Sequence, residues 1–130
     1  MYSQKLLDYF HHPRHAGEIE HATAVIETSN PACGDLMKLW VVVRDGRIAE
    51  AKFKVAGCVP AVACGSWLAE HLSGRLLANL EPLSPTEIDS ALEGLPAASQ
   101  HAAVLASDTL KALLTKISSS TTRQSRNSSR

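Results

Sequence analysis

The sequence predicts an α+β domain in which helices pack on one face of a small antiparallel three-stranded sheet. Three segments, at residues 24–28, 37–44 and 48–55, are rich in β-branched residues or alternate between apolar and polar ones, as strands do. The dipeptide Asp45-Gly46, a strong hairpin signal, joins the second segment to the third. From residue 60 onward the apolar spacing is helical, and strands followed by helices are typical of an α+β domain.

A short helix is predicted ahead of the strands. Ser3 suits the N-cap position, and Leu6, Leu7 and Phe10 then fall on one side of the helix. The helix must end near Pro13, because the residue before a proline is disfavoured in helical geometry. A loop is therefore expected between this helix and the first strand.

Three helices are predicted after the strands. The first covers residues 60–72, begins with a proline, and is stopped by Gly74. The run Ser84-Pro85-Thr86-Glu87 is a capping box that opens a short helix reaching residue 92. A longer helix follows over residues 99–117.

Residues 118–130 are predicted to form a disordered tail. They are rich in serine and threonine, contain three arginines, and have no apolar side chain except the threonine methyl groups. Such a segment cannot bury enough surface to offset the entropy of ordering it. The folded domain is therefore expected to cover residues 1–117, and a chain of 130 residues with 45% hydrophobic residues can form one such core.

Composition excludes several classes of protein. Thirteen basic residues balance thirteen acidic ones, so no nucleic-acid or membrane partner is expected. No apolar run approaches the roughly 20 residues that span a bilayer, and the start has no signal-peptide core, so a cytoplasmic location is expected. Three cysteines are too few for a disulfide framework. They are then free thiols, metal ligands or reactive groups.

The residues that could perform chemistry fall in three separate groups. The first is Asn30-Pro31-Ala32-Cys33-Gly34-Asp35, the second is Gly57-Cys58-Val59-Pro60, and the third is His101. Two cysteines, an aspartate and a histidine form a ligand set suited to zinc or iron rather than to magnesium or calcium. Cys58 also precedes a predicted helix N-terminus, where the helix dipole would lower the pKa of the thiol. The structural alternatives are a buried Cys58 at a strand end and a His101 that only packs.

In this order and spacing, these residues resemble the IscU/NifU family of iron–sulfur cluster assembly scaffolds. The resemblance runs from Tyr2 to about Lys116 and includes the segments 2–8, 12–17, 30–39, 53–58 and 101–108. It implies an IscU/NifU-like α+β fold and a protein that acts by binding and transfer, not as an enzyme. Cys33, Asp35, Cys58 and His101 match family positions that bind iron, a [2Fe-2S] cluster or, in the same site, zinc.

The resemblance also implies partners. A cysteine desulfurase would supply sulfur, and apo iron–sulfur acceptor proteins would receive the cluster. A homodimer that shares a cluster is compatible with the same ligands. Asp35 would be a hard ligand among soft ones, which should make a bound cluster labile.

The sequence departs from the family pattern at several places. Ala102 occupies the position where the family has a third cysteine, directly after the matched histidine. The Leu-Pro-Pro-Val-Lys motif recognised by a dedicated Hsp70 chaperone is replaced by residues 95–99, so chaperone-driven release is not assumed. Cys64 could replace the missing thiol only if its helix face pointed to the site. Its place in the apolar stripe Ala61, Cys64, Leu68 and Leu72 favours burial instead.

Two other functions remain compatible with the sequence. A divergent relative could bind zinc and act as a regulatory or interaction protein of the cysteine desulfurase system, which would fit the missing third cysteine. A thiol enzyme could use Cys33 or Cys58 with His101 and Asp35 as base and orienting group.

Overall fold

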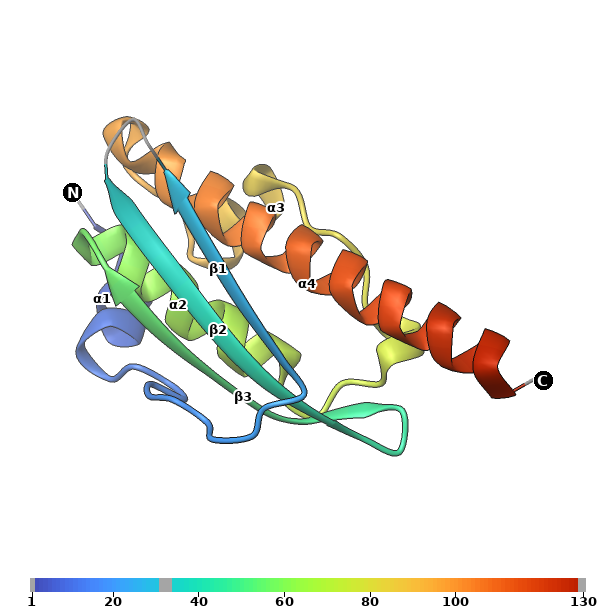
Figure 1. Cartoon of the computed structure of the whole chain (residues 1–130). Coiled ribbons are helices and arrows are strands. Elements are labelled where there is room, and N and C mark those ends of the chain that lie inside the picture. Colours follow the sequence, from blue (N-terminus) through green and yellow to red (C-terminus); the bar gives the residue numbers. More distant parts are fainter. Residues whose placement is uncertain (1, 31–33, 129–130) are drawn as a thin grey trace.

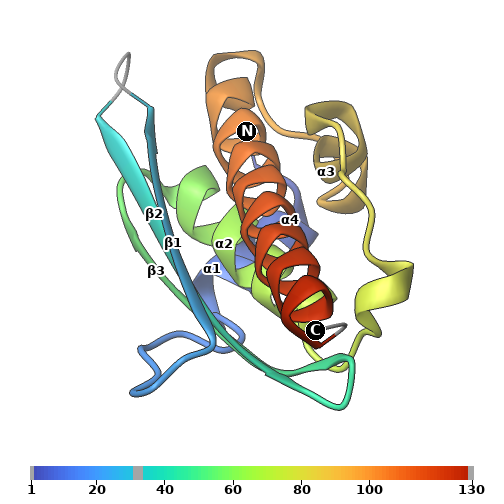
Figure 2. The same cartoon turned by 45° about the vertical axis from the view of Figure 1, so that its right-hand side comes forward.

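The computed structural model describes residues 2–30 and 34–128, with side chains as far as residue 118. In chain order the elements are α1 (Gln4–His11), β1 (Ala24–Asn30), β2 (Asp35–Arg44), β3 (Arg47–Ala56), α2 (Val59–Leu72), the 3-10 turn η1 (Leu77–Asn79), α3 (Pro85–Ala91), the 3-10 turn η2 (Ala97–Ser99) and α4 (Gln100–Ser128). The sheet forms one layer, and α1, α2 and α4 lie on one of its faces (Figures 1 and 2). The predicted α+β fold class is confirmed.

The three strands form an antiparallel meander in the order β1-β2-β3. Asp45 and Gly46 turn the chain between β2 and β3 with φ values of 55° and 72°. Positive φ at both central residues is the geometry that makes Asp-Gly a hairpin signal. The turn lies at the opposite end of the sheet from the end of β1 and the start of β2 (Figure 1).

Helix α2 is the centre of the hydrophobic core. It contacts α1, α4 and the inner face of β3, and most of its residues are buried. Cys64 and Leu68 are 0% exposed and lie in the core cluster with Leu39 of β2 and Leu105 of α4. The apolar stripe predicted on this helix is therefore a packing face.

The capping box predicted at the start of α3 is present. The Ser84 hydroxyl accepts from the backbone N–H of Glu87 at 3.1 Å, and the Glu87 carboxylate accepts from the backbone N–H of Ser84 at 2.7 Å. These two bonds satisfy N–H groups that the first turn of a helix cannot pair internally.

We expect Ser84→Ala to lower the free energy of unfolding by about 1 kcal/mol, because the Glu87 N–H loses its partner. Urea denaturation measures this change. Ser90→Ala, in an exposed position of the same helix, is the matched control and should leave stability nearly unchanged. Equal stability of the two variants would contradict the prediction.

Helix α4 is longer than expected from the sequence. The helix was predicted to end at residue 117, but the structure continues it to Ser128. Extending an existing helix adds one hydrogen bond per residue without a new nucleation step, so a polar segment can follow an apolar one. The disordered tail and the domain boundary at residue 117 stay predictions, because side chains beyond residue 118 lie outside the described part.

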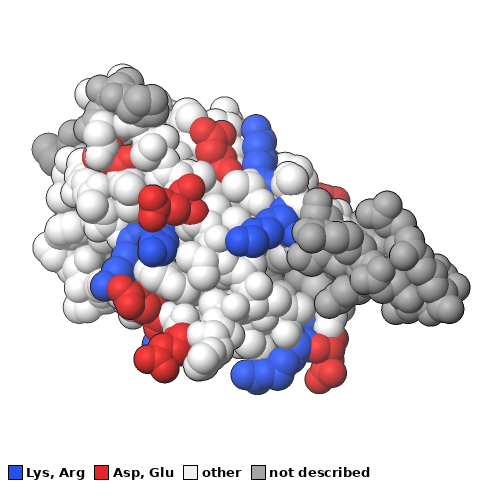
Figure 3. Space-filling view, viewed as in Figure 1, with Lys and Arg blue, Asp and Glu red and all other residues white. Residues whose placement is uncertain are grey.

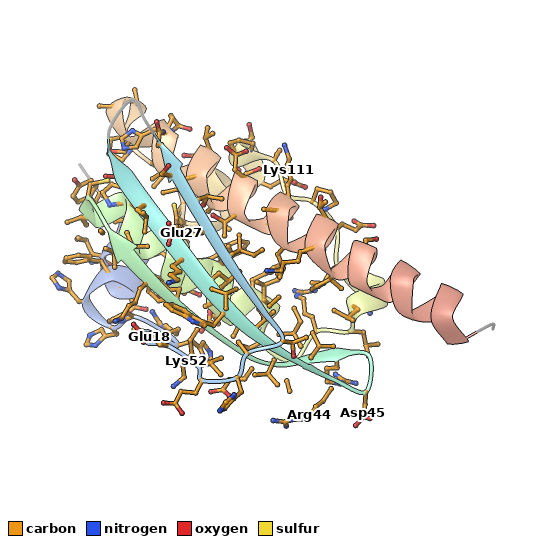
Figure 4. All side chains as sticks on the ribbon, viewed as in Figure 1. Glu18, Glu27, Arg44, Asp45, Lys52 and Lys111 are labelled. Atoms are coloured by element: carbon orange, nitrogen blue, oxygen red, sulfur yellow. The ribbon has the colours of Figure 1, made fainter. Side chains whose placement is uncertain are left out.

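The surface mixes charges of both signs. Lys54 contacts Glu18 at 2.6 Å, and Lys38 contacts Glu27 at 4.0 Å. On the face shown in Figure 3, basic and acidic side chains alternate rather than gather by sign. Figure 4 shows the same mixture around the labelled residues, from Glu18 and Lys52 beside the N-terminal loop to Arg44 and Asp45 at the hairpin. Among the described residues, no helix is both long and apolar enough to cross a membrane.

Candidate functional site: a three-ligand cluster at one end of the sheet

The candidate site lies where several element ends come together. The start of β2, the end of β3, the start of α2 and the start of α4 gather at the end of the molecule away from the Asp45-Gly46 hairpin (Figure 1). Asp35 is the first residue of β2, Cys58 lies between β3 and α2, and His101 is in the first turn of α4. The fold therefore brings together three residues that are far apart in sequence.

Asp35 provides the buried centre of this cluster. It pairs with Asn30 across the β1–β2 ladder, and its side chain is 8% exposed. The Cys58 thiol donates to Asp35 Oδ2 at 3.1 Å. His101 Nε2 lies 3.4 Å from the same oxygen. A buried carboxylate normally needs such partners, because desolvation is costly for a charged group.

Cys58 is the N-cap residue of α2, but it does not act as a cap. No hydrogen bond from the helix to its side chain closes the cap, and the thiol is directed to Asp35 instead. Burial raises the pKa of the Cys58 thiol, and the Asp35 carboxylate raises it further. The backbone N–H of Ala61, which is near the thiol without closing a cap hydrogen bond, lowers the pKa by less. The expectation of a lowered pKa for Cys58 is therefore wrong. Proximity to a helix N-terminus does not determine the pKa of a thiol that is partly buried beside a carboxylate.

His101 completes the cluster from the third side. Its Nε2 lies 3.7 Å from Cys58 Sγ, and its side chain is 30% exposed. Cys58 is also only partly buried. The cluster is thus closed on the Asp35 side and open to solvent at the cysteine and the histidine.

The separations between the three atoms fit the edges of a tetrahedral metal site. Metal bonds of about 2.0–2.3 Å at tetrahedral angles place neighbouring ligand atoms about 3.4–3.6 Å apart. The observed separations are 3.1 Å for sulfur to oxygen, 3.4 Å for nitrogen to oxygen and 3.7 Å for sulfur to nitrogen. The three atoms lie close enough together for one ion to contact all of them once the sulfur and the oxygen, the pair nearest to each other, move slightly apart.

The same geometry argues against a thiol enzyme. In a catalytic triad the carboxylate holds one ring nitrogen of the histidine while the other nitrogen faces the nucleophile. Here Asp35 and Cys58 approach the same nitrogen, Nε2 of His101. The raised pKa of Cys58 also disfavours the thiolate that an enzyme nucleophile needs. The arrangement differs in this respect from the proton relay of a catalytic triad.

Of the four residues that the sequence marks as a ligand set, the structure brings together Asp35, Cys58 and His101. Cys33 lies outside the described residues. Cys64 lies in the core, as its place in the apolar stripe predicted: it is 0% exposed, and burial raises its pKa to about 12. Ala102 is also 0% exposed, beneath His101 in the core cluster.

A small hollow near the site was not expected from the sequence. It has a volume of about 150 Å³ and is lined by Ser29, Asn30, Val104, Leu105 and Asp108. Val104, Leu105 and Asp108 come from α4 and follow His101 by one to two turns on the same side of the helix. This spacing could have identified them from the sequence. Asn30 links the hollow to the site, since it is the ladder partner of Asp35.

We expect the affinity for zinc to rise with pH through the neutral range. A metal-bound thiol must be deprotonated, and the pKa of Cys58 is raised, so its proton competes with the ion. For one displaced proton the affinity should rise by about tenfold per pH unit while the pH stays below that pKa. Calorimetric titration at several pH values measures the zinc affinity. Repeating it in buffers of different ionisation enthalpy measures the number of protons displaced.

Cys58→Ser is the control for this dependence, because a serine hydroxyl has no comparable titration. Any binding that remains in this variant should have a weaker pH dependence. An affinity that does not change with pH in the unmodified protein would contradict the proton competition.

Comparison with known proteins identifies the family of the chain. A family model for the NifU-like N terminal domain matches residues 1–124. "Iron-sulfur cluster assembly scaffold protein IscU 1" of Archaeoglobus fulgidus is 39% identical over 111 residues, which cover 85% of this chain and 72% of that protein. "Iron-sulfur cluster assembly scaffold protein IscU" of Escherichia coli K12 is 36% identical over 117 residues, covering 87% and 91% of the two chains.

Solved structures show the same fold at lower sequence identity. FiSufU from Fervidobacterium islandicum AW-1 superimposes with a TM-score of 0.66 at 22% identity, covering 85% of this chain and 93% of that one. The N-terminal part of a NifU-like protein from Brucella abortus gives a TM-score of 0.65 at 14% identity, covering 83% and 88%. Together, the family model, the relatives and the shared fold show that the chain belongs to the NifU-like N-terminal domain family, as its sequence motifs predicted.

Proposed function

We propose that the protein is a scaffold or carrier in iron–sulfur cluster assembly. It would bind iron and a labile [2Fe-2S] cluster as cargo and pass the cluster to acceptor proteins. The observation that supports this most directly is the convergence of Asp35, Cys58 and His101, whose ligand atoms lie within 3.7 Å of one another. The relatives named as IscU scaffolds support the same assignment.

In this proposal each residue has a distinct part. Cys58 and Cys33 supply thiolates, which are the usual ligands of iron–sulfur clusters. His101 supplies an imidazole nitrogen from the open side. Asp35 supplies a hard oxygen ligand, which binds iron less firmly than a thiolate does and so favours release of the cargo. Sulfur would come from a cysteine desulfurase, and the recipients would be apo iron–sulfur proteins.

Exposure of the site fits a transfer protein. Cys58 and His101 are reached from solvent at one end of the molecule, while Asp35 is buried beneath them. A cargo held there would be accessible to another protein without unfolding of the core.

Anaerobic reconstitution tests the proposal. The purified protein is mixed with ferrous iron, cysteine and a cysteine desulfurase, and the visible sulfur-to-iron charge-transfer absorption is recorded. We expect absorption that is lost in Cys58→Ala and that moves to an apo-ferredoxin when that acceptor is added. Absence of absorption, both with the desulfurase and with free sulfide, would reject the scaffold function.

The alternative is a zinc-binding regulatory relative of the desulfurase system. One observation favours it: position 102 is a buried alanine, so among the described residues Cys58 is the one accessible thiol. The three-atom geometry suits a single tetrahedral ion as well as an iron of a cluster. Tight zinc binding together with failure to transfer a cluster to the apo-ferredoxin would favour this alternative.

A further inference from the structure

The residue directly before Cys58 is a glycine, Gly57. Gly57 joins the end of β3 to the N-cap of α2. Gly34, Gly46, Gly74 and Gly94 have φ values in the left-handed region, and this backbone conformation explains why a glycine stands at each of them. The φ of Gly57 is not in that region. A different reason must therefore account for a glycine at position 57.

That reason is the space occupied by Asp35. A Cβ placed on Gly57 would lie 2.6 Å from Asp35 Cγ, 2.6 Å from Asp35 Oδ1 and 3.0 Å from Asp35 Cβ. Non-bonded carbon atoms approach optimally at about 3.5–4.0 Å, so this space is not available to a side chain. The Asp35 carboxylate lies directly against the Gly57 backbone.

We infer that Gly57 is a positioning residue for the ligand set: the absence of a side chain lets the Asp35 carboxylate lie where it meets both Cys58 and His101. This inference rests on the proposed metal-binding function. A Cβ at position 57 would displace the carboxylate by about 1 Å, or would move the backbone that holds Cys58. Metal–ligand bonds tolerate about 0.2 Å, so either movement would disrupt the three-atom geometry.

The fold should tolerate this displacement better than the site does. The new Cβ would approach the Asp35 carboxylate most closely. Asp35 can therefore relieve the contact by moving the end of its side chain. Gly65, inside the helix α2 that follows, offers a contrast. A Cβ on Gly65 would lie 2.7 Å from Phe53 Cδ2 and 3.0 Å from Val55 Cγ2, both in side chains of the sheet. Gly65→Ala is therefore a matched control that disturbs packing without touching a ligand.

The test is binding of cobalt(II), whose visible spectrum reports the ligands and their geometry. For Gly57→Ala we expect affinity to fall about 10–100-fold, the loss typical when a ligand is no longer held in place, and the spectrum to change. The urea midpoint of the metal-free protein should stay close to that of the unmodified chain. Gly65→Ala should lower the urea midpoint and keep the spectrum.

A double-mutant cycle separates positioning from a general structural effect. If Gly57 acts through Asp35, adding Gly57→Ala to Asp35→Ala should cause little further loss of affinity, because the displaced carboxylate is already gone. The same double variant should recover stability if Gly57→Ala alone folds poorly. Equal losses from Gly57→Ala in both backgrounds, or an unchanged affinity and spectrum in the single variant, would overturn the inference. Failure of the unmodified protein to bind cobalt at all would instead reject the proposed function, and the inference with it.

Discussion

Cys58→Ala is expected to abolish metal and cluster binding by the site while leaving the chain folded. The substitution removes the sulfur that lies 3.1 Å from Asp35 and 3.7 Å from His101. Loss of a group that only orients a ligand lowers metal affinity by about 10–100-fold. Loss of the ligand itself should lower the affinity by more than that. Zinc or cobalt titration measures the affinity, and circular dichroism checks the fold.

Cys64→Ala is the matched control for this experiment. It removes the other described thiol, which is fully buried in α2, six residues after Cys58. We expect lower stability from the lost core contacts but normal metal binding. Metal affinity that depends on Cys64 as strongly as on Cys58 would show that the buried thiol reaches the site and would contradict the ligand set proposed above.

Leu68→Ala is expected to be strongly destabilising. Leu68 is 0% exposed and lies in the core cluster between the sheet and α4. Removal of a fully buried leucine side chain costs about 2–5 kcal/mol, the sum of lost burial and a residual cavity. Since small domains have a total stability of about 5–15 kcal/mol, the urea midpoint should fall substantially.

The exposed Leu76 provides the comparison. It is 39% exposed, just before η1, so Leu76→Ala makes the same chemical change with a smaller loss of burial. Its cost should stay near 0.5 kcal/mol, roughly the level of ordinary surface substitutions. Similar losses for Leu68→Ala and Leu76→Ala would mean that α2 does not anchor the core.

Local signals in the sequence predicted the elements well. The Asp45-Gly46 turn and the Ser84–Glu87 capping box depend only on residues that are neighbours in the chain. Their conformations follow from backbone preferences and from short-range hydrogen bonds, which the sequence contains in full. The far end of α4 was missed because helix propagation from a packed segment is not visible in the composition of the polar residues that follow.

The sequence pointed to residues that the structure brings together, but it did not predict the electrostatics of this cluster. Residue types and family resemblance identified Asp35, Cys58 and His101, and the structure brings these three together. The raised pKa of Cys58 could not be foreseen, because it depends on burial and on a carboxylate 23 positions away in sequence. The role we infer for Gly57 could not be foreseen either, because it depends on a contact with Asp35, which is distant in sequence.

The wide spacing of the three ligands has a consequence for how the chain matures. Cys58 is 23 positions from Asp35 and 43 positions from His101, so the complete set exists only after long loops have closed. A growing chain would lack the last ligand until α4 had been synthesised and had docked on the sheet. An ion bound by all three would then favour the native state by mass action, by about 2.7 kcal/mol at a concentration 100 times the dissociation constant. Loading of the site and completion of folding would thus be coupled events, with an empty molecule more readily unfolded than a filled one.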